Sequence, residues 1–76
     1  MQKKRIDLLD TVALLEDLPN RGLERGEVGT VVEVLAPEVY EVEFSDDDGQ
    51  TYAQFALRTE QIVALHIQGE GLKLAA

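Results

Sequence analysis

The sequence predicts an all-β fold, a small barrel of five short strands. Segments rich in β-branched residues recur along the chain, one of them alternates between apolar and acidic residues, and turn-forming residues separate them. The chain has 76 residues, 45% of them hydrophobic, which suffices for one core. We therefore expect a single barrel domain over residues 10–67, a basic N-terminal segment at 1–9 and a flexible C-terminal tail at 68–76.

The first expected strand covers residues 10–15, and residues 16–22 follow as a loop rich in strand breakers. Ile6, Leu9, Ala13 and Leu14 also share one face of a helix, so the periodicity leaves a helix open as the alternative here.

The second strand is expected at residues 30–35, because this stretch is dense in β-branched side chains. Gly22, Gly26 and Gly29 punctuate the segment before it. We interpret Gly26 and Gly29 as structural residues that take positive φ or let a neighbouring strand approach closely. A phosphate-binding loop would need a helix and a Lys after the glycines, whereas residues 28–35 continue as strand.

A hairpin is expected next, after a short turn at residues 36–38. Its strands lie at 39–44 and 51–57, and the turn 46–49 contains a Gly that can take positive φ. Glu41 and Glu43 alternate with apolar residues and should therefore face solvent. The inward-facing residues of the hairpin are expected to be Tyr40, Val42, Phe44, Ala53, Phe55 and Leu57.

The end of the domain is predicted to be one helical turn at residues 59–61, capped by Thr59, and a last strand at 62–67. Five short strands with one late hairpin and a 3₁₀-like turn before the final strand follow the order of an SH3-like barrel.

The stretch Arg21–Val34 resembles the glycine-spaced strand start of KOW-type and related SH3-like barrels, with a Gly, a charged residue, Val, Gly and then a β-branched run. Together with Asp10–Leu14 and Tyr40–Phe44, it more closely resembles an uncharacterised bacterial family of short acidic proteins, a domain of unknown function, over roughly residues 8–65. This resemblance implies a fold and a bacterial cytoplasmic setting, but no activity or cofactor. The KOW similarity implies contact with RNA or ribosomes, yet Glu24 and Glu27 stand where an RNA-binding protein has basic residues.

Charge is the strongest compositional feature, with 15 acidic and 7 basic residues and a net charge of −8. Residues 6–76 contain four of the basic residues and all fifteen acids, a net charge of −11. Nucleic-acid affinity depends on clustered Lys and Arg against phosphates, so we do not expect nucleic acid as a partner. The alternative explanation of the negative charge is that the acidic surface only keeps the protein soluble.

Catalysis and cofactor binding are not expected. The chain has no Cys, one Ser (Ser45) and one His (His66), and nothing brings these two residues together with a carboxylate. The run Asp46–Gly49 is not a calcium loop, because the twelfth position, which needs a bidentate Glu, is Leu57. We predict no enzyme activity, no cofactor and no metal site.

No segment approaches the roughly 18 apolar residues of a membrane span, and the basic start lacks the apolar run of a signal peptide. The expected location is the cytoplasm. The final Leu74-Ala75-Ala76 is similar to the ending by which bacterial proteases recognise tagged proteins, although three residues also match by coincidence.

A partner-binding face is predicted on the acidic hairpin, because Tyr52 and Gln54 fall on the face that carries Glu41 and Glu43. Tyr52 lying against the barrel as a structural residue is the alternative. The predicted partner-binding residues are Glu41, Glu43, Asp46, Asp47, Asp48, Tyr52, Gln54 and Arg58.

The leading hypothesis is a non-enzymatic binding module, a monomer or weak homodimer, whose acidic surface recognises a basic protein partner, as an antitoxin, immunity-type or inhibitor protein does. The alternative is a structural or assembly module that dimerises or docks onto a larger bacterial complex through a strand edge. A KOW-like nucleic-acid or ribosome-associated module ranks third.

Overall fold

A computed structural model describes the backbone of residues 6–68 and 71–74 and the side chains of residues 6–65. The basic residues 3–5, the last two residues of the ending Leu74-Ala75-Ala76 and the side chain of His66 lie outside these ranges.

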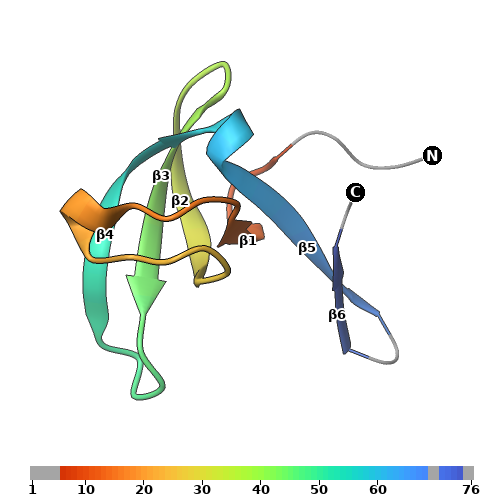
Figure 1. Cartoon of the computed structure of the whole chain (residues 1–76). Coiled ribbons are helices and arrows are strands. Elements are labelled where there is room, and N and C mark those ends of the chain that lie inside the picture. Colours follow the sequence, from red (N-terminus) through yellow and green to blue (C-terminus); the bar gives the residue numbers. More distant parts are fainter. Residues whose placement is uncertain (1–5, 69–70, 75–76) are drawn as a thin grey trace.

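The fold is all-β, with one antiparallel sheet in the strand order β4-β3-β2-β1-β5-β6 (Figure 1). Two short 3₁₀ turns, η1 (Pro19–Arg21) and η2 (Thr59–Gln61), are the only helical segments among the described residues. The strands are β1 (Thr11–Leu14), β2 (Val28–Ala36), β3 (Val39–Ser45), β4 (Thr51–Arg58), β5 (Ile62–Gln68) and β6 (Gly71–Leu74).

The central strand β1 resolves the ambiguity between strand and helix in favour of the strand. It pairs with β2 on one side and with β5 on the other, so that Val12 lies opposite both Gly29 and Ala64. Val12 and Leu14 are buried completely or almost so. Two flanking strands satisfy the backbone groups of β1, which a four-residue segment could not do by itself as a helix.

Gly29 allows β2 and β3 to pack closely. A Cβ atom at this position would lie 2.8 Å from both the Glu43 carbonyl oxygen and Val42 Cγ1, and 3.0 Å from Phe44 Cδ2. Only glycine fits such a distance to a backbone atom, so the prediction that Gly29 serves a close approach is confirmed. Gly26 and Gly49 have φ of 93° and 80°, which confirms their predicted positive φ.

The predicted hairpin of β3 and β4 is confirmed, with Val42 opposite Phe55 and Phe44 opposite Ala53. Phe44 is fully buried, and its ring centroid lies 5.8 Å from that of Phe55. The apolar positions of β3 therefore point into the core as the alternation predicts. The buried core cluster consists of Ile6, Val12, Leu14, Leu23, Val31, Tyr40, Val42, Phe44, Leu57, Ile62 and Ala64.

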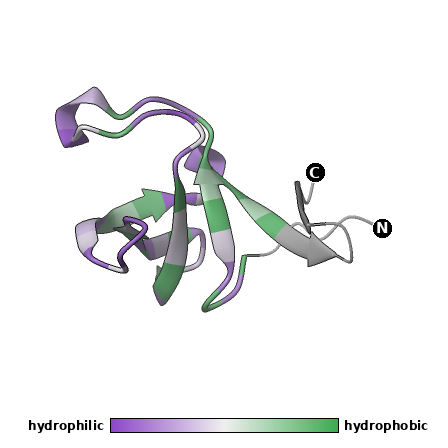
Figure 2. Ribbon diagram, turned by 90° about the horizontal axis from the view of Figure 1, so that it is seen from below, coloured by the Kyte–Doolittle hydropathy of each residue, from purple (hydrophilic) through white to green (hydrophobic). Residues whose placement is uncertain are grey.

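The long loop between β1 and β2, residues 15–27, crosses β4 and β3 on the core side of the sheet (Figure 1). Leu23 is buried in the core and Leu18 packs against it, and the two residues pair through an isolated β-bridge. The tip of the loop around η1 is hydrophilic (Figure 2). The loop therefore closes one side of the core with Leu18 and Leu23 and exposes its polar tip.

Two expectations about the end of the domain need correction. Gly71–Leu74 form a sixth strand paired with β5, so the described residues contain one strand more than the five predicted, and this strand lies within the segment predicted as a tail. Thr59 does not cap η2. The residue before the turn, Arg58, instead donates its backbone N–H to Gln61 Oε1 at 2.8 Å, and Thr59 Oγ1 is buried without a hydrogen-bond partner among the described residues.

Candidate functional site

The outer face of strands β2, β3 and β4 carries a row of acidic and amide side chains. The ladder places Thr30 opposite Glu43 and Glu43 opposite Gln54, and it places Glu33 opposite Glu41. Residues directly opposite in an antiparallel ladder share one face of the sheet. We call Glu33, Glu41, Glu43 and Gln54 the acidic face.

Two carboxylates of the acidic face accept hydrogen bonds from neutral side chains of β4. Thr51 Oγ1 donates to Glu43 Oε2 at 2.8 Å, and Gln54 Nε2 donates to Glu41 Oε2 at 3.3 Å. The alternation predicted that Glu41 and Glu43 would be fully open to water. Both residues are instead half-buried, because the neighbouring strands cover part of each side chain. Neutral donors restrict the carboxylates without removing their charge.

Glu33 lies directly opposite Glu41, which puts two negative charges side by side on the same face. Like charges in opposite positions destabilise a sheet. Glu33 is not among the site residues predicted from the sequence, because its register depends on a β-bulge in β2 between Val31 and Glu33. Such an irregularity shifts the alternation by one residue and leaves no clear sequence signal.

Tyr52 is 50% exposed and donates its hydroxyl to Glu27 Oε1 at 2.8 Å. This hydrogen bond raises the pKa of Tyr52, and slight burial and the negative charges of Glu27 and Asp46 act in the same direction. Glu27 belongs to the loop 15–27 and is 25 positions away in the chain. Tyr52 therefore ties the start of β4 to that loop instead of to Glu41 or Glu43, the neighbours predicted for it.

Asp46 has a local structural role in the turn between β3 and β4. Its Oδ1 accepts hydrogen bonds from the backbone N–H groups of Asp48 at 3.0 Å and Gln50 at 2.9 Å. This is the usual way in which an Asp side chain closes a turn. Asp47 and Asp48 are exposed on the same turn, so these two carboxylates remain directed to solvent.

Arg58 lies at the other end of β4 from Tyr52. The two residues are six positions apart along the strand, about 20 Å at the usual rise per residue. Its Nε lies 3.1 Å from Glu60 Oε2 in an exposed ion pair. The structure therefore does not bring Arg58 together with the tyrosine of the predicted site.

The loop 15–27 is held in place by contacts at several points. The guanidinium carbon of Arg21 lies 4.4 Å from the centre of the Phe55 ring, a cation–π contact with β4. The backbone N–H of Arg25 donates to Asp17 Oδ1 at 2.8 Å, and that of Glu24 donates to Glu27 Oε2 at 2.7 Å. Arg21 and Glu27 are not among the residues predicted from the sequence, because both contact residues far away in the chain.

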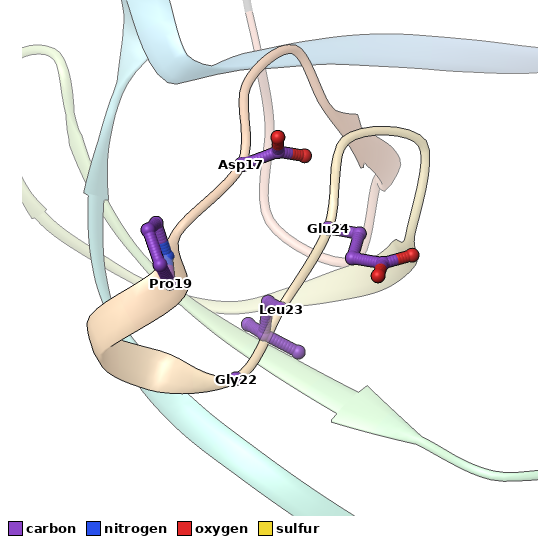
Figure 3. A pocket seen from close by; sticks show the side chains of 5 residues that line it. All are labelled: Asp17, Pro19, Gly22, Leu23 and Glu24. Carbon is purple, nitrogen blue, oxygen red and sulfur yellow. The ribbon is translucent and has the colours of Figure 1, made fainter.

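A pocket of about 310 Å³ opens within this loop (Figure 3). Asp17 and Pro19 come from one arm of the loop, Leu23 and Glu24 come from the other, and Gly22 lies at the bend between them. A side chain at Gly22 would meet open space, and its φ of 71° is one that glycine adopts readily.

Among the described residues, no group of three or more His, Asp or Glu side chains is arranged to hold a metal ion. None of the helical segments described is long and apolar enough to cross a membrane.

Comparison with known proteins gives one match. The family model "Domain of unknown function (DUF4926)" matches residues 8–64, which covers β1 to β4 and the beginning of β5. No curated protein and no solved structure matches the chain.

Proposed function

The chain belongs to the DUF4926 family, and we propose that it is a non-enzymatic binding module whose acidic surface recognises a basic protein partner. The structural part of this proposal is an SH3-like barrel, for which the meander from β1 to β4 and the return of β5 to β1 are the supporting features.

One observation carries the proposal: two carboxylates of the acidic face, Glu41 and Glu43, accept hydrogen bonds from neutral donors and have no ion pair among the described residues. Thr51 and Gln54 orient Glu43 and Glu41. Carboxylates already held in one geometry lose less side-chain entropy when a cation binds.

The charge of the whole chain supports the same partner class. A net charge of −8 attracts a basic protein over distances comparable to the Debye length and raises the association rate. The repulsion between Glu33 and Glu41 is relieved when a cationic group binds between them. An antitoxin, an immunity-type protein or an inhibitor that covers a cationic active site, in a bacterial cytoplasm, is the specific form of this proposal.

The test is affinity capture with the full chain, compared with the double variant Glu41→Lys/Glu43→Lys at low and high salt. We expect a basic protein to bind the unmodified chain, more strongly at low salt, and to be lost with the variant. The control is Glu60→Lys, which changes an exposed charge beside Arg58, outside the acidic face. Capture of the same proteins by the double variant and the unmodified chain would rule the acidic face out.

A second candidate function, a structural or assembly module, is favoured by the position of β4. It is the last strand at its end of the sheet, and within the described residues no other strand pairs with its free edge. Such an edge can add a strand from another chain. Concentration-dependent sedimentation of the purified chain, with NMR shifts confined to β4 backbone amides, would favour assembly over recognition of a basic partner.

A further inference from the structure

We infer that the pocket in the loop 15–27 is a binding site for one arginine side chain of a protein partner. This inference extends the proposed function, because it places a specific contact beside the general attraction of the acidic face. It rests on the pocket's size, chemistry and rigidity.

The size of the pocket fits a single side chain. Its volume of about 310 Å³ lies at the lower end of the range for small-molecule sites, which begins near 300 Å³. The pocket is open to solvent at the loop surface, where Asp17 and Glu24 are exposed. A side chain that projects from a partner's surface can therefore enter without any movement of the barrel.

The lining combines apolar and anionic groups in the way that an arginine requires. Pro19 is exposed and offers apolar surface to the methylene stem, whereas Leu23 is buried, and Asp17 and Glu24 carry carboxylates on opposite arms of the loop (Figure 3). The planar guanidinium has five N–H donors in a fixed fork and is weakly hydrated, so it suits two carboxylates beside an apolar wall better than the compact lysine ammonium does.

The carboxylates of the pocket are available to a ligand. Asp17 uses Oδ1 to accept the backbone N–H of Arg25, and no hydrogen bond to its Oδ2 or to the Glu24 carboxylate is formed within the described residues. The two basic residues of the same loop do not neutralise the pocket. Arg21 lies over the Phe55 ring, and Arg25 forms no ion pair within the described part of the chain.

The pocket is preorganised by contacts on both arms. Leu18 and Leu23 join the arms through a β-bridge, and Leu23 is buried in the core. Glu24 is linked through its backbone N–H to Glu27, and Glu27 accepts the hydroxyl of Tyr52 from β4. A site with this support loses little conformational entropy on binding. The same chain of contacts links the pocket to Tyr52, the aromatic residue predicted for partner binding.

The experiment is an NMR titration of the ¹⁵N-labelled full chain with a blocked arginine, N-acetyl-arginine N-methylamide. We expect the largest amide shifts at Asp17 and residues 22–25, with a dissociation constant on the order of millimolar, as suits so small a ligand. Blocked citrulline, which has nearly the same shape and no charge, should bind at least about tenfold more weakly. Blocked lysine should bind several-fold more weakly than blocked arginine.

Two variants test the carboxylates separately. Asp17→Asn keeps an oxygen that can accept the Arg25 N–H and removes the charge, and Glu24→Gln removes the charge from the other arm. Each should weaken the binding of blocked arginine about threefold to tenfold. Asp47→Asn is the matched control, because it makes the same change of charge on the exposed turn, and it should alter binding less than twofold.

The outcomes separate this inference from the proposed function. Shifts confined to the acidic face, or equal binding by Asp17→Asn, Asp47→Asn and the unmodified chain, would overturn the pocket and leave recognition of a basic partner by the acidic face intact. Binding of blocked arginine in the pocket would support the inference whatever the result of partner capture. Unchanged partner capture by Glu41→Lys/Glu43→Lys would overturn only the proposed role of the acidic face.

Discussion

The two faces of β3 have the same backbone and opposite environments. On the inner face, Val42 and Phe44 are completely buried, and Gly29 is the only residue that fits against them. On the outer face, Glu41 and Glu43 are half-buried and accept hydrogen bonds from side chains of β4. Close packing permits few substitutions at the inner residues. The outer residues contact other surface side chains, and substitutions there should leave the fold intact. We therefore expect stability to depend on the inner face and recognition on the outer face.

The largest effect is expected at the inner face. Phe44→Ala should lower the free energy of unfolding by about 3 to 5 kcal/mol, because it removes a fully buried ring and leaves a cavity beside Phe55. Urea denaturation followed by circular dichroism measures this loss. Tyr52→Ala, which removes a half-exposed ring, is the control. A similar loss in both variants would contradict the difference between buried and exposed positions.

A smaller effect is expected from adding a single methyl group at the inner face. Gly29→Ala should cost about 1 to 3 kcal/mol, since the new Cβ would lie 2.8 Å from a backbone oxygen of β3 that cannot move alone. Thermal unfolding of this variant can be compared with Thr30→Ala, the next position on the same strand. An unchanged melting temperature for Gly29→Ala would show that β2 and β3 can separate without cost.

At the exposed side, the bond between Tyr52 and Glu27 predicts a pH dependence at alkaline pH. The pKa of Tyr52 is raised in the folded protein above the unfolded value of about 10. Its contribution to stability is therefore complete below about pH 10 and is lost as the pH rises through the raised pKa. The tyrosinate absorbance of the native chain, after subtraction of the Tyr52→Phe variant, reports this titration.

The control for this titration is Glu27→Gln, which keeps an acceptor for the Tyr52 hydroxyl and removes the negative charge. We expect the pKa of Tyr52 to fall toward its ordinary value in this variant. An identical titration in both proteins would mean that Tyr52 does not contact Glu27 in solution.

The outer face itself should change stability least. Glu33→Lys replaces a repulsive pair opposite Glu41 with an attractive one and should raise the free energy of unfolding by about 0.2 to 1 kcal/mol. The gain should shrink as salt screens the charges. Glu38→Lys, the same charge change at the turn before β3, is the control. Equal gains in the two variants would mean that only net charge matters.

The sequence predicts those parts of the fold that depend on a local pattern of apolar, polar and turn-forming residues. The alternation of Tyr40, Val42 and Phe44 with Glu41 and Glu43 predicts a half-buried strand, and the observed burial confirms its inner face. The β6 strand was not predicted because Gly71–Leu74 contains no β-branched residue, and it becomes a strand through pairing with β5.

The candidate site was predictable only in part. The register of the hairpin brings Gln54 to Glu41, a contact that alternation alone suggests. Arg58 was grouped with Tyr52 because both are on β4, yet strand length keeps them apart. The pocket could not be predicted from the sequence, because its two arms are joined by Leu23 entering the core.

By itself the sequence determined the all-β class, the inner face of the hairpin and the acidity of the chain, since periodicity, turn residues and charge are local properties. Only the tertiary structure decided that Glu27 meets Tyr52, that Arg21 lies over Phe55 and that Glu33 faces Glu41. These contacts depend on the path of a long loop and on a β-bulge, and both result from packing between residues far apart in the chain.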